Sequence, residues 1–243
     1  MRRPDRPPVP AAHVGDADPG YDGAVVSKRR TLPRPRASGV QLGSDVARNM
    51  IMLGATRVFA TRGYRATSVE DLLEAGQVSR RTFYRFFKSK DDVALAMYRL
   101  GTASLVEDCR RAITQEADLL SQLERCIDIH LRNARDVGRL VFVLGGEAQS
   151  LESPLYPRRM EVHDLLVDLL DKAQPATARL DPLLLRALVL GMEAITRRVL
   201  EDGDEGRRVS KASIVRAREV TMRIMTATVA GTGERVTRLP MAE

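Results

Sequence analysis

The sequence predicts an all-α protein with nine helices, and three observations support this fold class. From Ser44 to about Gly231, apolar residues recur at spacings of three and four, as on one face of an α-helix. No segment alternates convincingly with a period of two, as a half-buried strand would. Aromatic residues make up only 4% of the chain and tryptophan is absent, so aliphatic side chains must build most of the core.

Local start and stop signals divide this stretch into helices. Ser79 and Ser210 are expected N-caps, and Gly63 is the expected left-handed residue after the first helix. Thr67 and Glu70 fit a capping box for the second helix. The helices are expected at about 45–62, 68–75, 80–87, 90–113, 118–134, 138–150, 157–172, 183–200 and 211–231.

Positive charge is concentrated near the start of the chain. Residues 1–44 and 45–104 each carry a net charge of +4, whereas 105–243 carry −1. A basic head on a nearly neutral body indicates a polyanionic partner at one end, although a basic surface can also serve solubility alone.

Several classes of protein are excluded by what the sequence lacks. No apolar stretch approaches the roughly 18 residues that a membrane span needs, and no apolar region follows the basic N-terminus, so we expect a cytoplasmic protein without a signal peptide. Cys109 and Cys126 are expected to be buried thiols rather than a disulfide. No nucleophile elbow, phosphate loop or zinc-protease signature occurs, so we expect neither an enzyme nor a cofactor.

Residues 68–87 have the spacing of a helix-turn-helix, two helices of about two turns joined by a tight turn. In the second of these helices Phe83, Phe86 and Phe87 are expected to point inward, which leaves the cations to face outward towards DNA. Arginine suits guanine, and hydroxyl and ammonium groups suit phosphate oxygens; a solvated cationic face is the alternative. The predicted DNA-binding residues are Thr67, Ser68, Ser79, Arg80, Arg81, Thr82, Tyr84, Arg85, Lys88 and Lys90.

A run of motif elements extends from the first expected helix to the start of the fourth. The elements are Ile51, Ala55, Val58-Phe59, Gly63-Tyr64, Thr67-Ser68-Val69, Asp71-Leu72, Val78-Ser79, Thr82-Phe83-Tyr84, Phe87 and Lys90. Through these elements, residues 48–95 resemble the DNA-binding domain of the TetR (tetracycline repressor) family of transcription regulators. The family usually has a glycine directly before the Val-Ser of the turn, whereas this chain has Gln77 there and Gly76 one position earlier.

The resemblance implies a homodimer whose two heads read the halves of a palindromic operator. It also implies that the last two long helices pair with their symmetry mates in a four-helix bundle. Helix 183–200 is too apolar for a solvated outer element, which favours the dimer, although burial within one subunit would also explain it. The predicted dimer contacts are Leu184, Leu188, Met192, Ile195, Val220 and Ile224.

The resemblance further implies a small-molecule pocket enclosed by the fourth to seventh helices. Gly145 and Gly146 cost roughly 1–2 kcal/mol inside a helix, which indicates either close approach of a ligand or close helix packing. His130 and His163 suggest a metal site only weakly, and we expect core histidines and no bound metal. The candidate pocket residues are Cys126, His130, Phe142, Gly145, Gly146, Gln149 and His163.

Together these features predict a homodimeric repressor that a small-molecule effector releases from DNA, with no membrane partner. The alternative is a ligand-independent or architectural DNA-binding protein, which a well-packed core between the fourth and seventh helices would favour. The basic run KRRTLPRPR at 28–36 is either a minor-groove arm or a solvated tail. The expected organisation is a disordered basic, proline-rich arm at 1–43, a DNA-binding domain at 44–104, a ligand-binding and dimerisation domain at 105–231 and a flexible tail at 232–243.

Overall fold

The computed structural model describes residues 38–116, 118–176, 179–204 and 209–231. Within these ranges the chain forms nine α-helices and no strand, so the predicted all-α class is confirmed. The helices are α1 (Ser38–Arg62), α2 (Val69–Gly76), α3 (Arg80–Phe86), α4 (Lys90–Gln115), α5 (Leu119–Val137), α6 (Arg139–Glu147), α7 (Tyr156–Ala173), α8 (Pro182–Asp204) and α9 (Lys211–Ala230).

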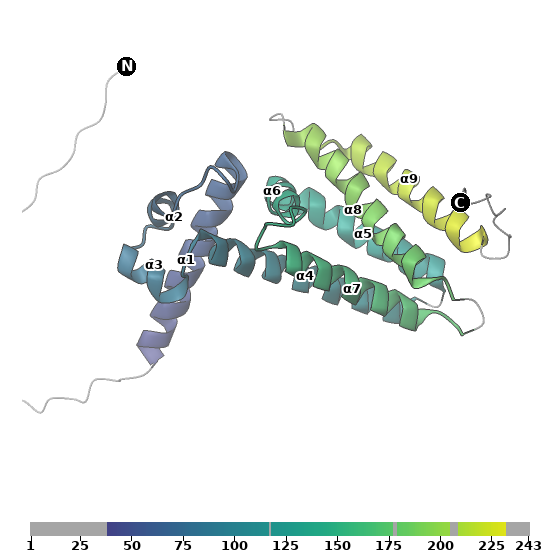
Figure 1. Ribbon diagram of the computed structural model, residues 1–243, viewed down its shortest axis with the longest axis horizontal. Coiled ribbons are helices and arrows are strands. Elements are labelled where there is room, and N and C mark those ends of the chain that lie inside the picture. Colours follow the sequence, from purple (N-terminus) through teal and green to yellow (C-terminus); the bar gives the residue numbers. More distant parts are fainter. Residues whose placement is uncertain (1–37, 117, 177–178, 205–208, 232–243) are drawn as a thin grey trace, which may run out of the picture.

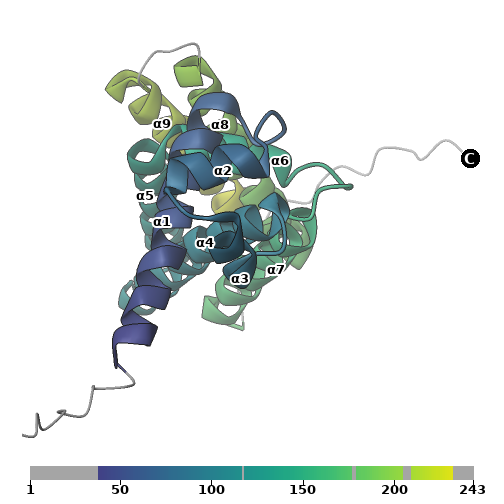
Figure 2. The ribbon, with the colours of Figure 1, turned by 90° about the vertical axis from the view of Figure 1, so that its left-hand side faces the viewer.

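The molecule has a small head and a larger helical body joined by α4. Helices α1 to α3 form the head at one end, and α6 lies where the body meets it (Figure 1). Seen from the head end, α1, α2 and α3 lie in front of the body helices (Figure 2). Helix α4 contributes Val93 and Met97 to the head core, and Cys109 and Ile113 to the body core. Residue 104, the expected domain boundary, therefore lies inside one continuous helix.

The head has an apolar core of its own. Ile51, Phe59, Leu72 and Phe83 are fully buried and belong to one cluster. Isolated helices as short as α2 and α3 are not stable in water. Their stability therefore comes from this shared core.

Helices α1 and α2 approach each other so closely that two glycines are needed at the contact. A Cβ atom on Gly54 would lie 2.5 Å from the backbone nitrogen of Gly76. A Cβ atom on Gly76 would lie 3.2 Å from the Cα of Ile51. Gly76 therefore serves helix packing, which explains a glycine at that position.

The turn between α2 and α3 begins at Gln77, which adopts the left-handed conformation with φ 50° and ψ 43°. The Gln77 N–H donates to the carbonyl of Glu74 and the Val78 N–H to that of Leu73, both at 3.1 Å. These two bonds form a Schellman motif. Gln77 therefore takes the left-handed position that a glycine usually occupies in the family, and the hydrogen bonds of the turn are still formed.

The predicted capping box of α2 was wrong by one residue. Ser68 is the N-cap: its hydroxyl accepts from the Asp71 N–H at 3.2 Å, and the Asp71 carboxylate accepts from the Ser68 N–H at 2.8 Å. Thr67 is instead 2% exposed, and its hydroxyl donates to the carbonyl of Gly63 at 2.7 Å. Thr67–Glu70 and Ser68–Asp71 each place an acidic residue three positions after a hydroxyl residue. The burial of Thr67, whose hydroxyl bonds back to Gly63, leaves Ser68 as the N-cap.

Two helix ends also differ from expectation. Helix α1 begins at Ser38, so residues 38–43 are helical where disorder was expected. Helix α8 continues to Asp204, through residues expected to form a loop. The basic run at 28–36 and the tail at 232–243 lie outside the described residues.

The body is held by an aliphatic core and by ion pairs between helices. Arg218 of α9 donates to Asp128 of α5 at 2.7 Å and also pairs with Glu124. Cys109 and Cys126 are free and buried, as the sequence predicts. The core and these ion pairs hold α9 against α5 on one side and α8 on the other.

Candidate DNA-binding surface and ligand cavity

Helix α3 has one apolar and one cationic face. Phe83 is fully buried and Phe87 is 3% exposed, with their ring centroids 6.1 Å apart. Tyr84 is 48% exposed, and its ring meets that of Phe83 edge-on at 5.4 Å. The exposed residues of α3 and the position after its C-cap are Arg80, Arg81, Tyr84, Arg85 and Lys88.

The cationic side chains of this surface differ in whether they already interact with a neighbouring side chain. Arg80 pairs with Glu70 of α2, and the Arg85 guanidinium lies 4.6 Å from the centroid of the Phe86 ring. Among the described residues, neither Arg81 nor Lys88 has an ion-pair partner. These two side chains can therefore bind a phosphate or a base without breaking an existing interaction.

Polar residues at the start of α3 hold that helix in place. Ser79 is its N-cap, and its hydroxyl accepts from the Thr82 N–H at 3.1 Å. The two hydroxyl oxygens of Ser79 and Thr82 lie 2.9 Å apart. Ser68, by contrast, is exposed at the start of α2 and bonded to Asp71.

The structure gives Thr67 and Lys90 a different role from the predicted phosphate contact. The Lys90 ammonium donates to the carbonyls of Tyr64, Arg65 and Thr67 at 3.1, 3.2 and 2.8 Å. An ammonium has three N–H donors, so all of them are used. Lys90 and the buried Thr67 therefore hold the loop after α1 against the start of α4.

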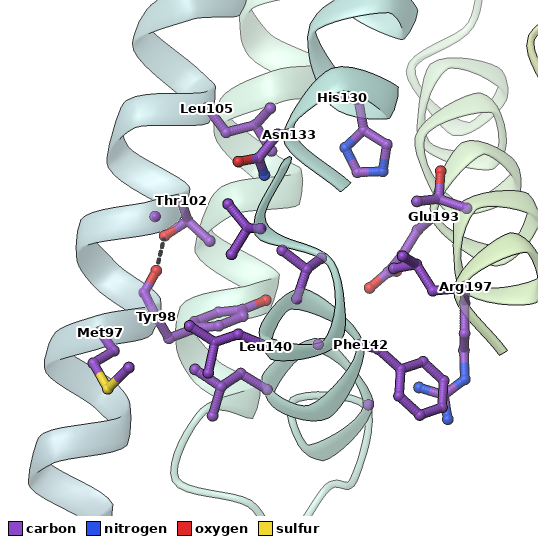
Figure 3. A pocket seen from close by; sticks show the side chains of 18 of the residues that line it. Met97, Tyr98, Thr102, Leu105, His130, Asn133, Leu140, Phe142, Glu193 and Arg197 are labelled. Carbon is purple, nitrogen blue, oxygen red and sulfur yellow. Dashed lines mark hydrogen bonds between the residues drawn. The ribbon is translucent and has the colours of Figure 1, made fainter. Parts of the chain in front are cut away.

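A cavity of about 170 Å³ lies in the body beside the head. Its walls come from α4, α5, α6 and α8 and are largely apolar. Tyr98, His130 and Glu193 surround the same space from α4, α5 and α8 (Figure 3). The polar lining residues are Tyr98, Thr102, His130, Asn133, Gln149, Glu193, Thr196 and Arg197.

His130 is the most unusual polar group of this cavity. Within the described part of the chain, both ring nitrogens are buried without a hydrogen-bond partner, and so is the hydroxyl oxygen of Thr196. Burial lowers the pKa of His130 to about 4, although the charge of Glu193 acts in the opposite direction. The imidazole is therefore neutral at physiological pH, with one N–H donor and one acceptor nitrogen.

Glu193 is ionised and firmly held. Burial alone would raise its pKa, but hydrogen bonds from His163 and Arg159 and the charge of Arg159 lower the pKa to about 2. Arg159 contacts the carboxylate through Nε at 3.0 Å and Nη2 at 2.6 Å. The Nε2 atom of His163 lies 3.4 Å from the same carboxylate. The charge of Glu193 is thus compensated by Arg159, which does not itself line the cavity.

The other predicted pocket residues divide into two groups. Phe142, Gly145, Gly146 and Gln149 line this cavity with His130, whereas Cys126 and His163 do not. Cys126 lines a smaller cavity of about 30 Å³, which also touches His130. His163 is 5% exposed and faces Glu193. In the described ranges no group of three possible metal ligands occurs.

The two glycines of α6 serve different purposes. A Cβ atom on Gly146 would lie 2.5 Å from Nη1 of Arg197, whereas one on Gly145 would meet nothing within 4 Å. The Arg197 guanidinium also lies 4.9 Å from the centroid of the Phe142 ring. Gly146 therefore makes room for Arg197, and Gly145 leaves the cavity wall open.

Helix α6 links the cavity to the head. Leu144 lines the cavity and also belongs to the head core, together with Ala148. Arg65 of the head pairs with Glu147 at 3.0 Å. Arg139 donates to the carbonyl of Ala60 in α1. A displacement of α6 by a ligand would therefore act directly on the head.

The head matches a known group of regulators. Residues 51–97, from the middle of α1 to the start of α4, match the profile described as "Bacterial regulatory proteins, tetR family". The head therefore contains a DNA-binding domain of the TetR family. The matched region contains the whole helix-turn-helix, so the predicted DNA-binding motif is confirmed as a motif of this family.

Two curated transcriptional regulators match part of the chain. The HTH-type transcriptional regulator TcmR of Streptomyces glaucescens is 44% identical over 75 residues, which are 30% of this chain and 33% of TcmR. The HTH-type transcriptional activator FasR of Mycolicibacterium smegmatis is 28% identical over 110 residues, 44% of this chain and 50% of FasR. The chain thus spans half or less of the length of these two relatives.

Solved structures extend the likeness of fold to the body. FadR of Bacillus subtilis, solved in complex with stearoyl-CoA, superposes with a TM-score of 0.62 at 18% identity. The superposition covers 75% of this chain and 98% of FadR. The body therefore shares the all-α fold of FadR. None of the helices in the described ranges is long and apolar enough to cross a membrane.

Sequence reasoning missed several polar residues of the cavity. Tyr98 comes from the fourth helix, which was expected to enclose the pocket, but it was not singled out. Glu193 and Arg197 come from α8, which was expected to form the dimer interface. In isolation each of the three fits a solvated helix face. Glu193 gave one usable signal, a lone carboxylate in the otherwise apolar stretch LVLGMEAI. Its partners Arg159 and His163 lie 34 and 30 positions earlier, so no local pattern connects them to it.

Proposed function

We propose that this chain is a homodimeric transcriptional repressor, acting on DNA in the cytoplasm, that leaves a palindromic operator when a small molecule enters the body cavity. The observation that carries the proposal is that α6 both lines the cavity and packs into the head core through Leu144. A ligand that favours one position of α6 shifts the population of head orientations, because it binds the two arrangements with different affinity.

The exposed face of α3 is the proposed base-reading surface. Arg81 and Tyr84 project from it while Phe83 and Phe87 anchor the helix below. An arginine on such a helix can bond bidentately to guanine in the major groove. The remaining proposed contacts are Ser68, Ser79, Arg80, Thr82, Arg85 and Lys88; Thr67 and Lys90 instead brace the head.

Exposed apolar residues on α8 and α9 form the proposed dimer surface. Leu184, Val220 and Ile224 are 39, 41 and 46% exposed. Leu188 and Met192, also predicted as dimer contacts, are instead buried in the subunit's own core, and Ile195 packs partly against it. Leu183, Leu190 and Val215 add further exposed apolar area on these two helices. Pairing of two subunits through this face would bury it in a four-helix bundle, to which each subunit contributes its α8 and α9.

The cavity favours a ligand-responsive regulator over a ligand-independent or architectural DNA-binding protein. A protein without an effector would gain stability by filling a space of about 170 Å³ with side chains. FadR of Bacillus subtilis, which shares this fold, was solved in complex with stearoyl-CoA, so a protein of this fold can bind a small molecule. Here the space is well below the roughly 300–1,000 Å³ of pockets for drug-sized ligands, so we propose a smaller effector.

Two substitutions on α3 test the DNA-binding surface. Arg81→Ala should weaken operator binding about tenfold through loss of a base or phosphate contact, and Tyr84→Phe about fivefold through loss of one hydrogen bond. Binding is measured by fluorescence anisotropy on a site selected from random-sequence DNA with the full chain. Arg110→Ala, an exposed arginine on the body, is the matched control and should leave affinity unchanged. Equal affinity of all three variants would show that α3 does not read the operator.

A charge on the α8–α9 surface should break the dimer. Val220→Glu combined with Ile224→Glu should raise the dimer dissociation constant by about 100-fold or more, because four carboxylates would face one another across the interface. Light scattering after gel filtration measures the mass. Leu53→Glu, at a 63% exposed leucine of α1 in the head, is the control and should stay dimeric. A dimer that persists in the double variant would place the interface elsewhere.

A further inference from the structure

We propose that the effector is a small, uncharged molecule about the size of a single ring, with a hydroxyl group that hydrogen-bonds to His130. This inference rests on the proposed function in one respect, the assignment of the body cavity as the effector site. Three properties of the cavity lead to it: its volume, its unpartnered polar groups and its balance of charge.

The volume limits the size of the ligand. The cavity measures about 170 Å³. An apolar protein cavity of about 150 Å³ holds one benzene molecule. The space beside α6 therefore accommodates one ring with a short substituent, and a larger effector would have to displace the walls.

His130 specifies the polar group of the ligand. Both of its nitrogens are buried and, among the described residues, unpartnered, although burying polar groups without a hydrogen bond is unfavourable. The neutral ring offers an N–H donor on one nitrogen and a lone pair on the other. A hydroxyl can accept from the first or donate to the second, so it suits either tautomer. A carbonyl or carboxylate only accepts, and an ammonium only donates.

Thr196 provides a second polar point on the wall. Its hydroxyl oxygen is also buried and lacks a partner within the described ranges. Thr102, which lines the same cavity, is different because its hydroxyl already donates to the carbonyl of Tyr98 at 2.8 Å. Among the described residues, His130 and Thr196 are thus the lining side chains with buried polar atoms that have no hydrogen-bond partner.

The charges around the cavity disfavour an ionic ligand. Glu193 and Arg197 are the two charged residues among those that line it. Glu193 is neutralised by Arg159, and Arg197 lies 3.4 Å from the carboxylate of Glu201. An anion would meet the ionised Glu193, while a cation would compete with Arg159 for it. An uncharged ligand avoids both costs.

A panel of single-ring compounds that differ in one substituent tests the inference. Toluene, phenol, benzoate and benzylamine are titrated at neutral pH into the full chain without DNA, and the histidine ring signals are followed by NMR after ¹⁵N-histidine labelling. Phenol should bind about five- to tenfold more tightly than toluene, the value of one hydrogen bond between neutral groups. Benzoate and benzylamine should bind more weakly than toluene.

Variants connect this preference to His130. In His130→Phe, and in His130→Leu should the first not fold, phenol and toluene should bind equally. Thr114→Val, at an exposed threonine of α4 that does not line the cavity and whose hydroxyl donates to the carbonyl of Arg111, should keep the preference for phenol. Tightest binding by benzoate or benzylamine, or an unchanged phenol preference in the His130 variants, would overturn the inference. Because the readout involves no DNA, failure of phenol to release the operator would count against the proposed function alone.

Discussion

Replacing Gly54 with alanine should destabilise the head by about 3 kcal/mol, near the upper end for inserting a methyl group into a packed contact. The added Cβ would lie 2.5 Å from the nitrogen and 2.8 Å from the Cα of Gly76, and 2.7 Å from the carbonyl carbon of Ala75. All three are backbone atoms, so no side-chain rotation can relieve the clash. Helix α2 would have to move away from α1 and carry α3 with it.

The measurement is urea unfolding followed by circular dichroism, together with DNA binding below the transition. Gly43→Ala is the matched control, because it makes the same change in the same helix where nothing lies within 4 Å. Alanine there should stabilise the protein by up to about 1 kcal/mol, the difference in helix propensity. If Gly54→Ala were as stable as the control, the close approach of α1 and α2 would be wrong.

Replacing Glu193 with glutamine should cost about 2 to 3 kcal/mol at neutral pH. The substitution leaves the Arg159 guanidinium, whose side chain is 13% exposed, without its carboxylate, and a charge left uncompensated in a buried site is strongly destabilising. Glu161→Gln is the control: that carboxylate is 60% exposed and pairs with Arg158 on the same helix, so its loss should cost less than about 0.5 kcal/mol.

The pH dependence of stability gives this prediction a second readout. The pKa of Glu193 is about 2 in the folded protein against an ordinary 4.5. The contribution of Glu193 to the free energy of unfolding is therefore fully present above pH 4.5. It is lost as the pH falls from 4.5 towards 2, where the folded form also takes up the proton. The pKa of His130 is about 4 in the folded protein against an ordinary 6.5, so a further part of the stability is lost as the pH falls from 6.5 to 4.

Wild-type stability should therefore fall in two stages on acidification, and Glu193→Gln should lack the lower one. Urea midpoints measured from pH 7 to pH 3 follow both stages. Parallel curves for the two proteins would mean that Glu193 is not the held, ionised group described above.

Within single helices, sequence reasoning was accurate because the helical period determines which residues share a face. The inward Phe83 and Phe87 and the outward Arg81, Tyr84 and Arg85 were all predicted correctly. The N-caps Ser79 and Ser210 were also confirmed, since a cap depends on only three or four neighbouring residues.

Prediction was less successful where a helix is apolar on several sides. In α8 the sequence could not distinguish the buried Leu188 and Met192 from the exposed Leu184 and Leu190. Any face of such a helix satisfies the periodic pattern, so the neighbours decide which one is covered. The same ambiguity concealed the wall that α8 contributes to the cavity through Glu193, Thr196 and Arg197.

The amino-acid sequence by itself determined the all-α class, the helix-turn-helix and the two faces of α3, because each depends on residues within a few turns. Only the tertiary structure decided which polar groups are already used. The three N–H groups of the Lys90 ammonium donate to carbonyls 23 to 26 residues away, and the charge of Glu193 is neutralised by an arginine 34 residues away. A side chain shows its chemistry in the sequence, but its availability to DNA or to a ligand depends on partners that folding brings to it.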